Sequence, residues 1–184
     1  MKKLNKDIKL YNMILPPFML FAFVPYMWFI SLAGNFVIDS IVLILSTLII
    51  FRSFKETFST YKKLIIKVWL YGFLADFFGI LYLLVFSLTS IKFVDYEKFD
   101  ANSLGYKIWE GIHLATNGSH FDSIWGVIFI ASGILVTSIL IFVFDYFFVF
   151  KHRNFTKKQA IFTALTFAII TAPYTFLLPK SLFY

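Results

Sequence analysis

Asp76 stands in the middle of the apolar run LYGFLADFFGILYLL at 70–84, and its position suggests chemistry more strongly than any other residue. An acid at the centre of a membrane costs about 3 kcal/mol or more, so it must face other helices or water. One role is a proton or cation site in a transport path. The other is a hydrogen bond that joins two helices. Gly72 and Gly79 share its face of a helix, and such small residues let another helix approach closely.

Asn35 and Asp39 lie one helical turn apart in GNFVIDS, near the start of another apolar run. In the interpretation that we favour, Asn35 caps a helix and Asp39 in the first turn complements the helix dipole. In the alternative, Asn35, Asp39 and Asp76 form one polar pocket that opens to the outside. The order of the helices, and hence any contact between the two acids, cannot be deduced from the sequence.

Lys67 and Asp145 are expected at similar depths, toward the cytoplasmic ends of their helices. We predict an ion pair between them that fixes the packing of two helices. Alternatively, each side chain extends separately to the membrane surface. Lys67 and Asp76 are nine residues apart and therefore point to opposite sides of one helix, so they are not expected to pair.

A second group of ionisable residues lies in EGIHLATNGSHFDS at 110–123: Glu110, His113, His120 and Asp122. Nitrogen and carboxylate ligands of this kind suit zinc, and histidines can also sense pH. The spacing matches no established zinc pattern, and solvated polar residues are the simpler interpretation. We therefore predict no metal, no cofactor and no enzymatic activity, with a membrane-embedded hydrolase or transferase as a remote alternative.

The elements that position these residues follow from composition. The chain has 184 residues, of which 60% are hydrophobic and 15% charged, whereas soluble domains have about 25% charged residues. It has no cysteine, so disulfides and thiolate metal sites are excluded. We predict an all-α, polytopic membrane helix bundle that forms a single domain over 1–184. About five transmembrane helices are expected, at 16–33, 36–51, 64–91, 124–150 and 160–178.

The positive charge of the chain, +7 overall, has an alternating distribution. Lysines and arginines cluster before 16, at 52–63 and at 151–158, whereas the loop at 92–123 contains five of the ten acids. Because short basic loops stay in the cytoplasm, we predict a cytoplasmic N-terminus and an external C-terminus in a plasma membrane, of bacterial origin given the small size and short loops. The charge is a topology signal, so no nucleic-acid partner is expected.

The outer loop at 92–123 is predicted to contain an amphipathic helix that lies on the membrane surface, with Ser103 as its cap and Asn117-Gly118 as its end. Pro173 should interrupt the last span and leave carbonyls for Tyr or Thr side chains. In that span, alanines at 160, 164, 168 and 172 form a ridge that permits close packing, either within the bundle or against another copy.

Two classes of function fit these features. The first is a small transporter or permease subunit that moves a proton, cation or small solute past Asp76. The second is a non-transporting accessory, assembly or protective subunit whose buried acids are structural. Five spans are few for a complete transporter and no inverted repeat is visible, so we expect a homo-oligomer or a larger membrane complex. Besides such partners, only the lipid bilayer is expected.

Overall fold

The computed structural model describes residues 25–92, 98–151 and 155–178, and all regular structure in these ranges is helical. Four segments are long and apolar enough to cross a membrane, which confirms the predicted all-α membrane bundle. The longer elements are α2 (Pro25–Phe51), α3 (Phe54–Lys92), α4 (Leu104–Thr116), α5 (Ile124–Phe144) and α6 (Lys157–Ile170). The shorter ones are η3 (His120–Asp122), the π-helical η4 (Asp145–Phe150) and η5 (Tyr174–Leu177).

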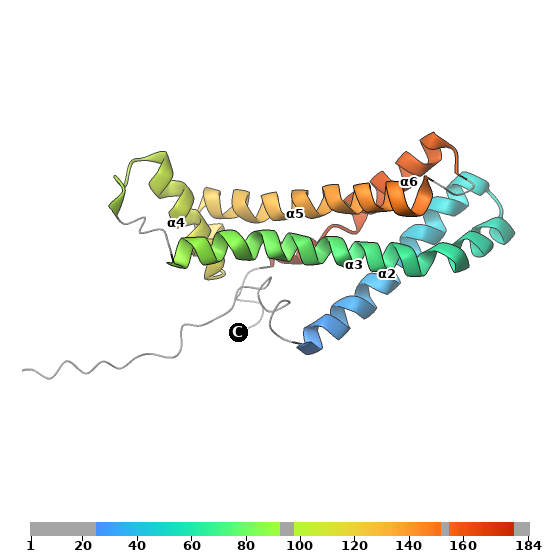
Figure 1. The fold of residues 1–184 in the computed structure, drawn as a ribbon, viewed down its shortest axis with the longest axis horizontal. Helices are drawn as coiled ribbons and strands as arrows, with labels where there is room; N and C mark the ends of the chain where they lie inside the picture. The colour runs from blue at the N-terminus through green and yellow to red at the C-terminus, as the bar shows by residue number, and fades with distance from the viewer. Residues whose placement is uncertain (1–24, 93–97, 152–154, 179–184) are drawn as a thin grey trace, which may run out of the picture.

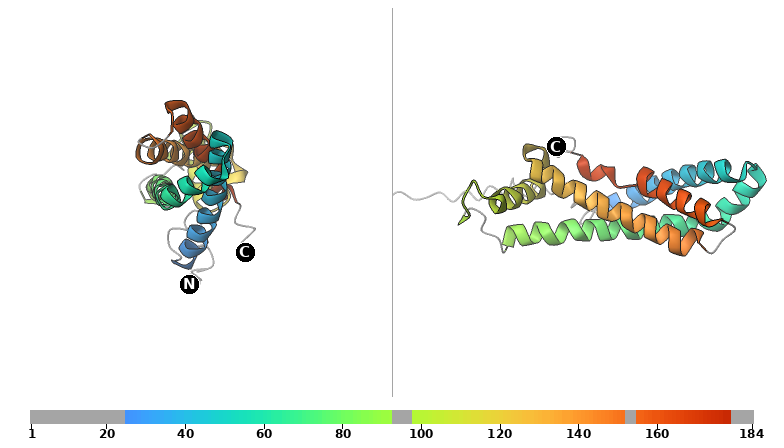
Figure 2. Two further views of the ribbon diagram at one scale, coloured as in Figure 1. Left: turned by 90° about the vertical axis from the view of Figure 1, so that its right-hand side faces the viewer. Right: turned by 90° about the horizontal axis from the view of Figure 1, so that it is seen from above.

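The bundle is built around α3, which has 39 residues and is therefore about 58 Å long. α5 lies along α3, and α2 and α6 complete a ring of four helices (Figures 1 and 2). In this ring α2 and α5 each contact both α3 and α6. α4 and η3 pack together at the end of α5 that lies far from α6 (Figure 1). The prediction of a helix in this segment is thus confirmed, and the helix packs at one end of the bundle. Its position on the membrane surface stays a prediction.

The predicted break between the first two spans, near Gly34 and Asn35, is wrong. α2 runs without interruption from Pro25 to Phe51, so Asn35 lies inside a helix and does not cap one. The physical reason is that a glycine in a helix costs only about 1 kcal/mol, whereas backbone groups without partners in lipid cost several kcal/mol each. Most of the predicted first span, together with the basic N-terminal residues, lies outside the described residues.

The ends of the helices are set by local polar contacts. Arg52 adopts a left-handed conformation, with φ of 52°, between α2 and α3. The Ser103 side chain accepts a hydrogen bond from the Tyr106 N–H at the start of α4, and Asn117 ends that helix, as predicted. Thr156 and Gln159 form a reciprocal capping box at the start of α6.

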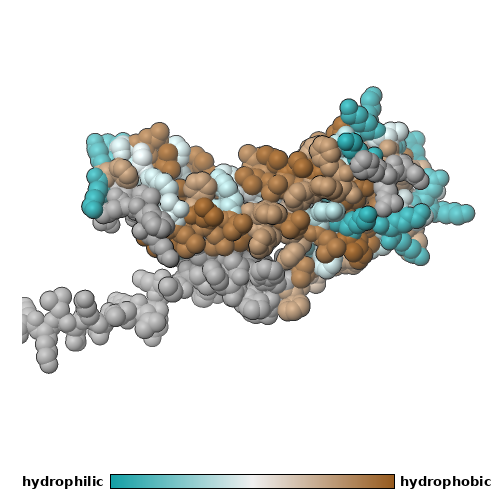
Figure 3. Space-filling model, viewed as in Figure 1, coloured by the Kyte–Doolittle hydropathy of each residue, from teal (hydrophilic) through white to brown (hydrophobic). Residues whose placement is uncertain are grey.

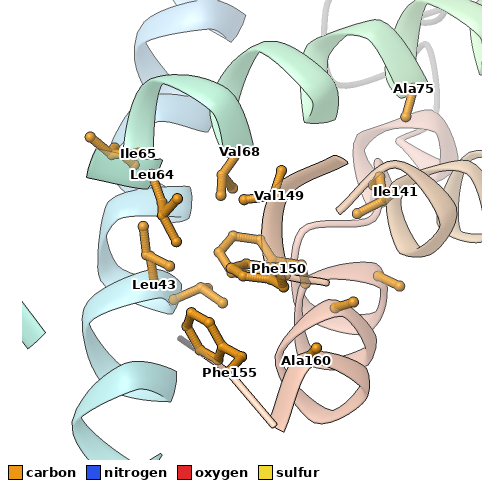
Figure 4. Close-up of a cluster of buried hydrophobic side chains, with 14 residues drawn as sticks. Leu43, Leu64, Ile65, Val68, Ala75, Ile141, Val149, Phe150, Phe155 and Ala160 are labelled. Atoms are coloured by element: carbon orange, nitrogen blue, oxygen red, sulfur yellow. The ribbon is translucent and has the colours of Figure 1, made fainter. Parts of the chain in front are cut away.

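Two apolar clusters fill the bundle. The inner cluster is Val42, Leu43, Leu64, Ile65, Val68, Ala75, Ile141, Val149, Phe150, Phe155, Ala160, Ala164, Phe167 and Ala168 (Figure 4). The outer cluster is Leu83, Ile112, Ala115, Phe129, Ile130, Ile134, Ala172 and Phe176. The four alanines of the predicted ridge on the last span are all buried within this chain, so the ridge packs inside the bundle.

The surface of the bundle matches a membrane environment. Large apolar side chains such as Ile49, Leu70 and Leu135 are more than half exposed. Figure 3 shows an apolar band across the middle of the molecule, with hydrophilic residues at its two ends. The α2–α3 and α5–α6 turns lie at the same end, where the rings of Phe51 and Phe155 are 5.4 Å apart. We call this basic end the inner end, and the end with α4 the outer end.

Candidate functional site

Asp76 on α3 is bound by an amide from α2. Asn35 Nδ2 donates a hydrogen bond of 2.8 Å to Asp76 Oδ2. The other carboxyl oxygen, Oδ1, is buried and has no hydrogen-bond partner. Asn35 makes this contact from inside the continuous helix α2, so the capping role that we favoured for Asn35 is wrong. Its side chain faces the polar interior that the alternative interpretation described.

Asp39 lies one turn along α2 from Asn35 and is buried. Its carboxylate faces Gly72 on α3, where a Cβ atom would stand 3.6 Å from Asp39 Oδ2. Asp39 is also within electrostatic reach of Asp76. Asp39 therefore packs directly against α3, and the two acids lie in one interior region, as the alternative interpretation of the sequence described.

Asp145 is the third member of this region. It is buried, and neither of its carboxyl oxygens has a hydrogen-bond partner. Asp39 is within electrostatic reach of Asp145 as well. We call Asn35, Asp39, Asp76 and Asp145 the acid group. It combines side chains from α2, from α3 and from the segment that continues α5.

The backbone changes at Asp145, because α5 ends at Phe144 and the next six residues form a π-helix. The N–H of Lys151 bonds to the carbonyl of Tyr146, five residues back, at 2.9 Å. Such π-helical insertions in α-helices are rare and occur frequently at functional sites. No pattern in the sequence indicated this insertion.

The predicted ion pair between Lys67 and Asp145 is absent from the structure. Lys67 is exposed on α3, whereas both oxygens of the buried Asp145 lack partners. The prediction placed both residues toward the inner end but could not say which face of α3 would turn toward α5. Lys67 therefore follows the alternative interpretation, with its ammonium group directed away from the bundle.

Close packing of α3 on α5 holds the acid group beside α5. Gly79, three residues after Asp76, lies against the side chain of Thr137, and a Cβ atom at that glycine would overlap the threonine hydroxyl. The Thr137 hydroxyl itself donates to the carbonyl of Gly133 at 2.9 Å. The predicted narrow face around Asp76 is therefore real, and it meets α2 at Gly72 and α5 at Gly79.

α6 ends beside the acid group. Ala75 on α3 and Ala168 on α6 belong to the inner apolar cluster, whereas Ile80 and Ala172 pack with the outer one, so Asp76 and the end of α6 both lie at the boundary between the clusters. The predicted interruption at Pro173 is confirmed, because α6 stops at Ile170.

Side-chain hydroxyls bond the carbonyls near this break. Tyr174 Oη donates to Ile169 O at 2.6 Å, and Thr171 Oγ1 donates to Phe167 O at 2.9 Å. In transporters, interrupted helices of this kind bring backbone carbonyls to ion sites near the middle of the membrane.

The outer ionisable residues do not form one site. Glu110 accepts a hydrogen bond of 3.3 Å from Tyr106 Oη, one turn away on α4, while His113 is half-buried in the last turn of that helix. His120 is buried with its Nε2 3.1 Å from Leu177 O, and Asp122 is exposed. Within the ranges that the structure describes, no three residues of the types His, Cys, Asp or Glu could hold one metal ion.

Comparison with known protein families, curated proteins and solved structures gave no match. The function of this chain therefore has to be argued from the acid group itself.

Proposed function

We propose that this chain is a small membrane transporter or permease subunit that moves a proton past Asp76, with Asp39 and Asp145 as further proton-binding groups. The observation that supports the proposal most directly is that three acids from three helix segments lie in one interior region, where Asp39 is within electrostatic reach of the other two. The Asn35 side-chain amide donates the single hydrogen bond that the structure gives to these carboxyl groups. Asp76 Oδ1 and both oxygens of Asp145 are buried without a partner. Unpaired acids in a membrane are costly and are characteristic of proton and ion pathways.

A proton suits this acid group better than a metal ion does. The described residues contain no cluster close enough to bind one metal, so a polydentate cation site has no support in the geometry. Protons, in contrast, need one oxygen at a time, and each proton bound by the group reduces the repulsion among neighbouring carboxylates.

The orientation belongs to the same proposal. The inner end contains Arg52, Lys55, Lys62, Lys63, Lys151, Lys157 and Lys158. By the positive-inside rule these residues support a cytoplasmic location for this end of the chain in a bacterial plasma membrane. The outer end, with α4, then faces outside. Because the described residues contain only four helices long enough to cross a membrane, we expect transport to require a homo-oligomer or a larger membrane partner.

One observation favours the alternative, a non-transporting accessory, assembly or protective subunit. The Asn35–Asp76 hydrogen bond joins α2 to α3, which is how a purely structural acid would act. The two functions differ in what Asp76 must do. Transport needs an acid that exchanges its proton, whereas a structural role needs only a hydrogen-bond acceptor, which an amide also supplies.

The test compares wild type with Asp76→Asn in liposomes that contain a pH-sensitive dye, under an imposed proton gradient. We expect the variant to lose at least tenfold in proton flux while its thermal unfolding stays close to wild type. Asp122→Asn is the matched control, because it makes the same chemical change at an exposed outer acid and should transport normally. Flux in neither wild type nor variant, with the fold intact, would overturn the transport proposal and support the structural role.

A further inference from the structure

Three buried polar groups between the acid group and the outer end have no hydrogen-bond partner among the residues that the structure describes: Ser87 Oγ, Ser90 Oγ and His120 Nδ1. Helical hydroxyls usually bond a carbonyl three or four residues back, and Thr89 on the same helix does so, donating to Val85 O at 2.8 Å. A buried group left unpaired costs about 1–3 kcal/mol. Enclosed water is the usual partner of such groups.

The two serines share the face of α3 that contains Asp76. Ser87 and Ser90 follow Asp76 by 11 and 14 residues, which are close to three and four helical turns. Ser87 therefore lies about 16 Å from Asp76 along the helix axis, toward the outer end. Both serines are buried, so this face of α3 is turned into the bundle over its whole outer half.

His120 lies at the same level as Ser90. Antiparallel pairing of α3 with α5 brings Leu83 against Gly133 and the ring of Phe86 to 6.3 Å from that of Phe129. Continuing this register by one turn places Ser90 opposite Gly126. A Cβ atom on Gly126 would stand 2.8 Å from the carbonyl oxygen of His120. The histidine and the two serines thus form a line that runs from the outer end toward Asp76.

An apolar side chain interrupts this line between Ser87 and Asp76. Leu83 is fully buried, and its Cγ occupies space only 2.7 Å from where a Cβ of Gly133 would be. On the inner side of Leu83, the Thr137 hydroxyl lies against α3 near Asp76. Apolar constrictions of this kind close pores by excluding water.

We propose that His120, Ser90 and Ser87 line a water-bearing route from the outer end of the bundle to the acid group, and that Leu83 closes it. The use of this route by protons rests on the proposed function, whereas the entry of water into the route does not. Water reaches the serines from the outer end and satisfies their hydroxyls. Movement of Leu83 away from Gly133 then connects this water to Thr137 and Asp76.

Single cysteines test the route, since the chain has none of its own. A cationic methanethiosulfonate reagent is placed on both sides of proteoliposomes, so that orientation in the membrane does not matter. The reagent modifies a thiolate, which forms in water. We expect Ser87→Cys to react at least tenfold faster than Val85→Cys, a lipid-exposed position nearby on α3. Equal or slower reaction of Ser87→Cys would overturn the route.

Leu83 is tested with the cysteine moved to the acid group. Asp76→Cys should react at least tenfold faster when combined with Leu83→Ala than alone, and equal rates would show that Leu83 is not the barrier. Labelling requires no transport, so the two proposals fail separately. Labelled Ser87→Cys in a protein without proton flux would overturn the proposed function, while flux that depends on Asp76 without labelling would overturn the route.

Discussion

The acid group and the outer ionisable residues differ in how their polar atoms are satisfied. At the outer end, His120 Nε2 contacts the Leu177 carbonyl and Glu110 accepts from Tyr106, so these two side chains connect neighbouring turns and segments, although His120 Nδ1 is buried and has no partner among the described residues. In the acid group, the Asn35–Asp76 bond is accompanied by three buried carboxyl oxygens that have no partner. The sequence favoured solvated polar residues for the first region, with metal binding or pH sensing as weak alternatives, and for the second it offered a transport site around Asp76 and an ion pair between Lys67 and Asp145.

This difference separates polar groups that hold the fold together from polar groups that remain available to a ligand. A buried side chain with its hydrogen bonds made contributes to stability, and its removal leaves a partner unpaired. A buried acid without partners lowers stability, so packing alone does not explain its position. The comparison therefore predicts opposite outcomes for substitutions in the two regions.

The largest effect on stability is expected at the outer end. His120→Ala removes a buried ring and leaves the Leu177 carbonyl without its partner, so the free energy of unfolding should fall by about 3 kcal/mol. Thermal unfolding in detergent measures this effect. Asp122→Ala, two residues away and exposed, is the control and should be nearly neutral. A His120→Ala protein as stable as its control would remove the distinction between the two regions.

A smaller loss is expected where α3 meets α5 beside the acid group. Gly79→Ala places a methyl group on the Thr137 hydroxyl and should lower the free energy of unfolding by about 1–3 kcal/mol. Combining it with Thr137→Ala relieves the overlap, so the double variant should lose less than the sum of the two single changes. Strictly additive losses would mean that this contact does not fix the distance between the helices.

Asn35→Leu tests the hydrogen bond within the acid group. The change leaves both oxygens of Asp76 unpaired and should lower the free energy of unfolding by about 1–2 kcal/mol. In an Asp76→Asn background the loss should shrink, since a neutral amide is less costly to bury unpaired than a carboxylate. Melting curves of the four proteins give the coupling energy. Without coupling, the hydrogen bond contributes nothing to stability.

The smallest effects are expected at Asp145 and Lys67. Asp145→Asn removes no hydrogen bond and should change the free energy of unfolding by less than about 1 kcal/mol, with a gain more readily explained than a loss. Lys67→Met, at an exposed position, should change it by about 0.5 kcal/mol or less. The double variant should be additive in thermal melts. If the double variant lost less stability than either single variant, the result would indicate an ion pair between Lys67 and Asp145 and would contradict the structure.

The helical class, the narrow face that Gly72 and Gly79 share with Asp76, and several helix ends could be predicted from the sequence. Composition and run length exceed what a soluble fold could hide, and Ser103, Asn117 and Pro173 act through local backbone chemistry. These features depend on neighbours in the chain, so a sequence pattern contains them.

Another prediction was wrong where two opposing free-energy costs act at the same residues. Gly34-Asn35 resembled a loop, yet the helix continues, because a broken backbone in lipid is more costly than a poor helix former. The π-helical segment from Asp145 also lacked any local signal, since its residues are ordinary helix-compatible aromatics and aliphatics.

The sequence by itself determined that this chain is a membrane helix bundle and that Asp76 must face away from lipid, because burying charge in hydrocarbon is too costly for any other arrangement. Only the tertiary structure decided which groups Asp76 meets. The packing of α2 and α5 on α3 brings Asn35 and Asp39 toward it, places Asp145 within electrostatic reach of Asp39, and turns Lys67 outward. The alanine ridge packs internally for the same reason: contacts between helices depend on rotation and order in the bundle, which no single helix encodes.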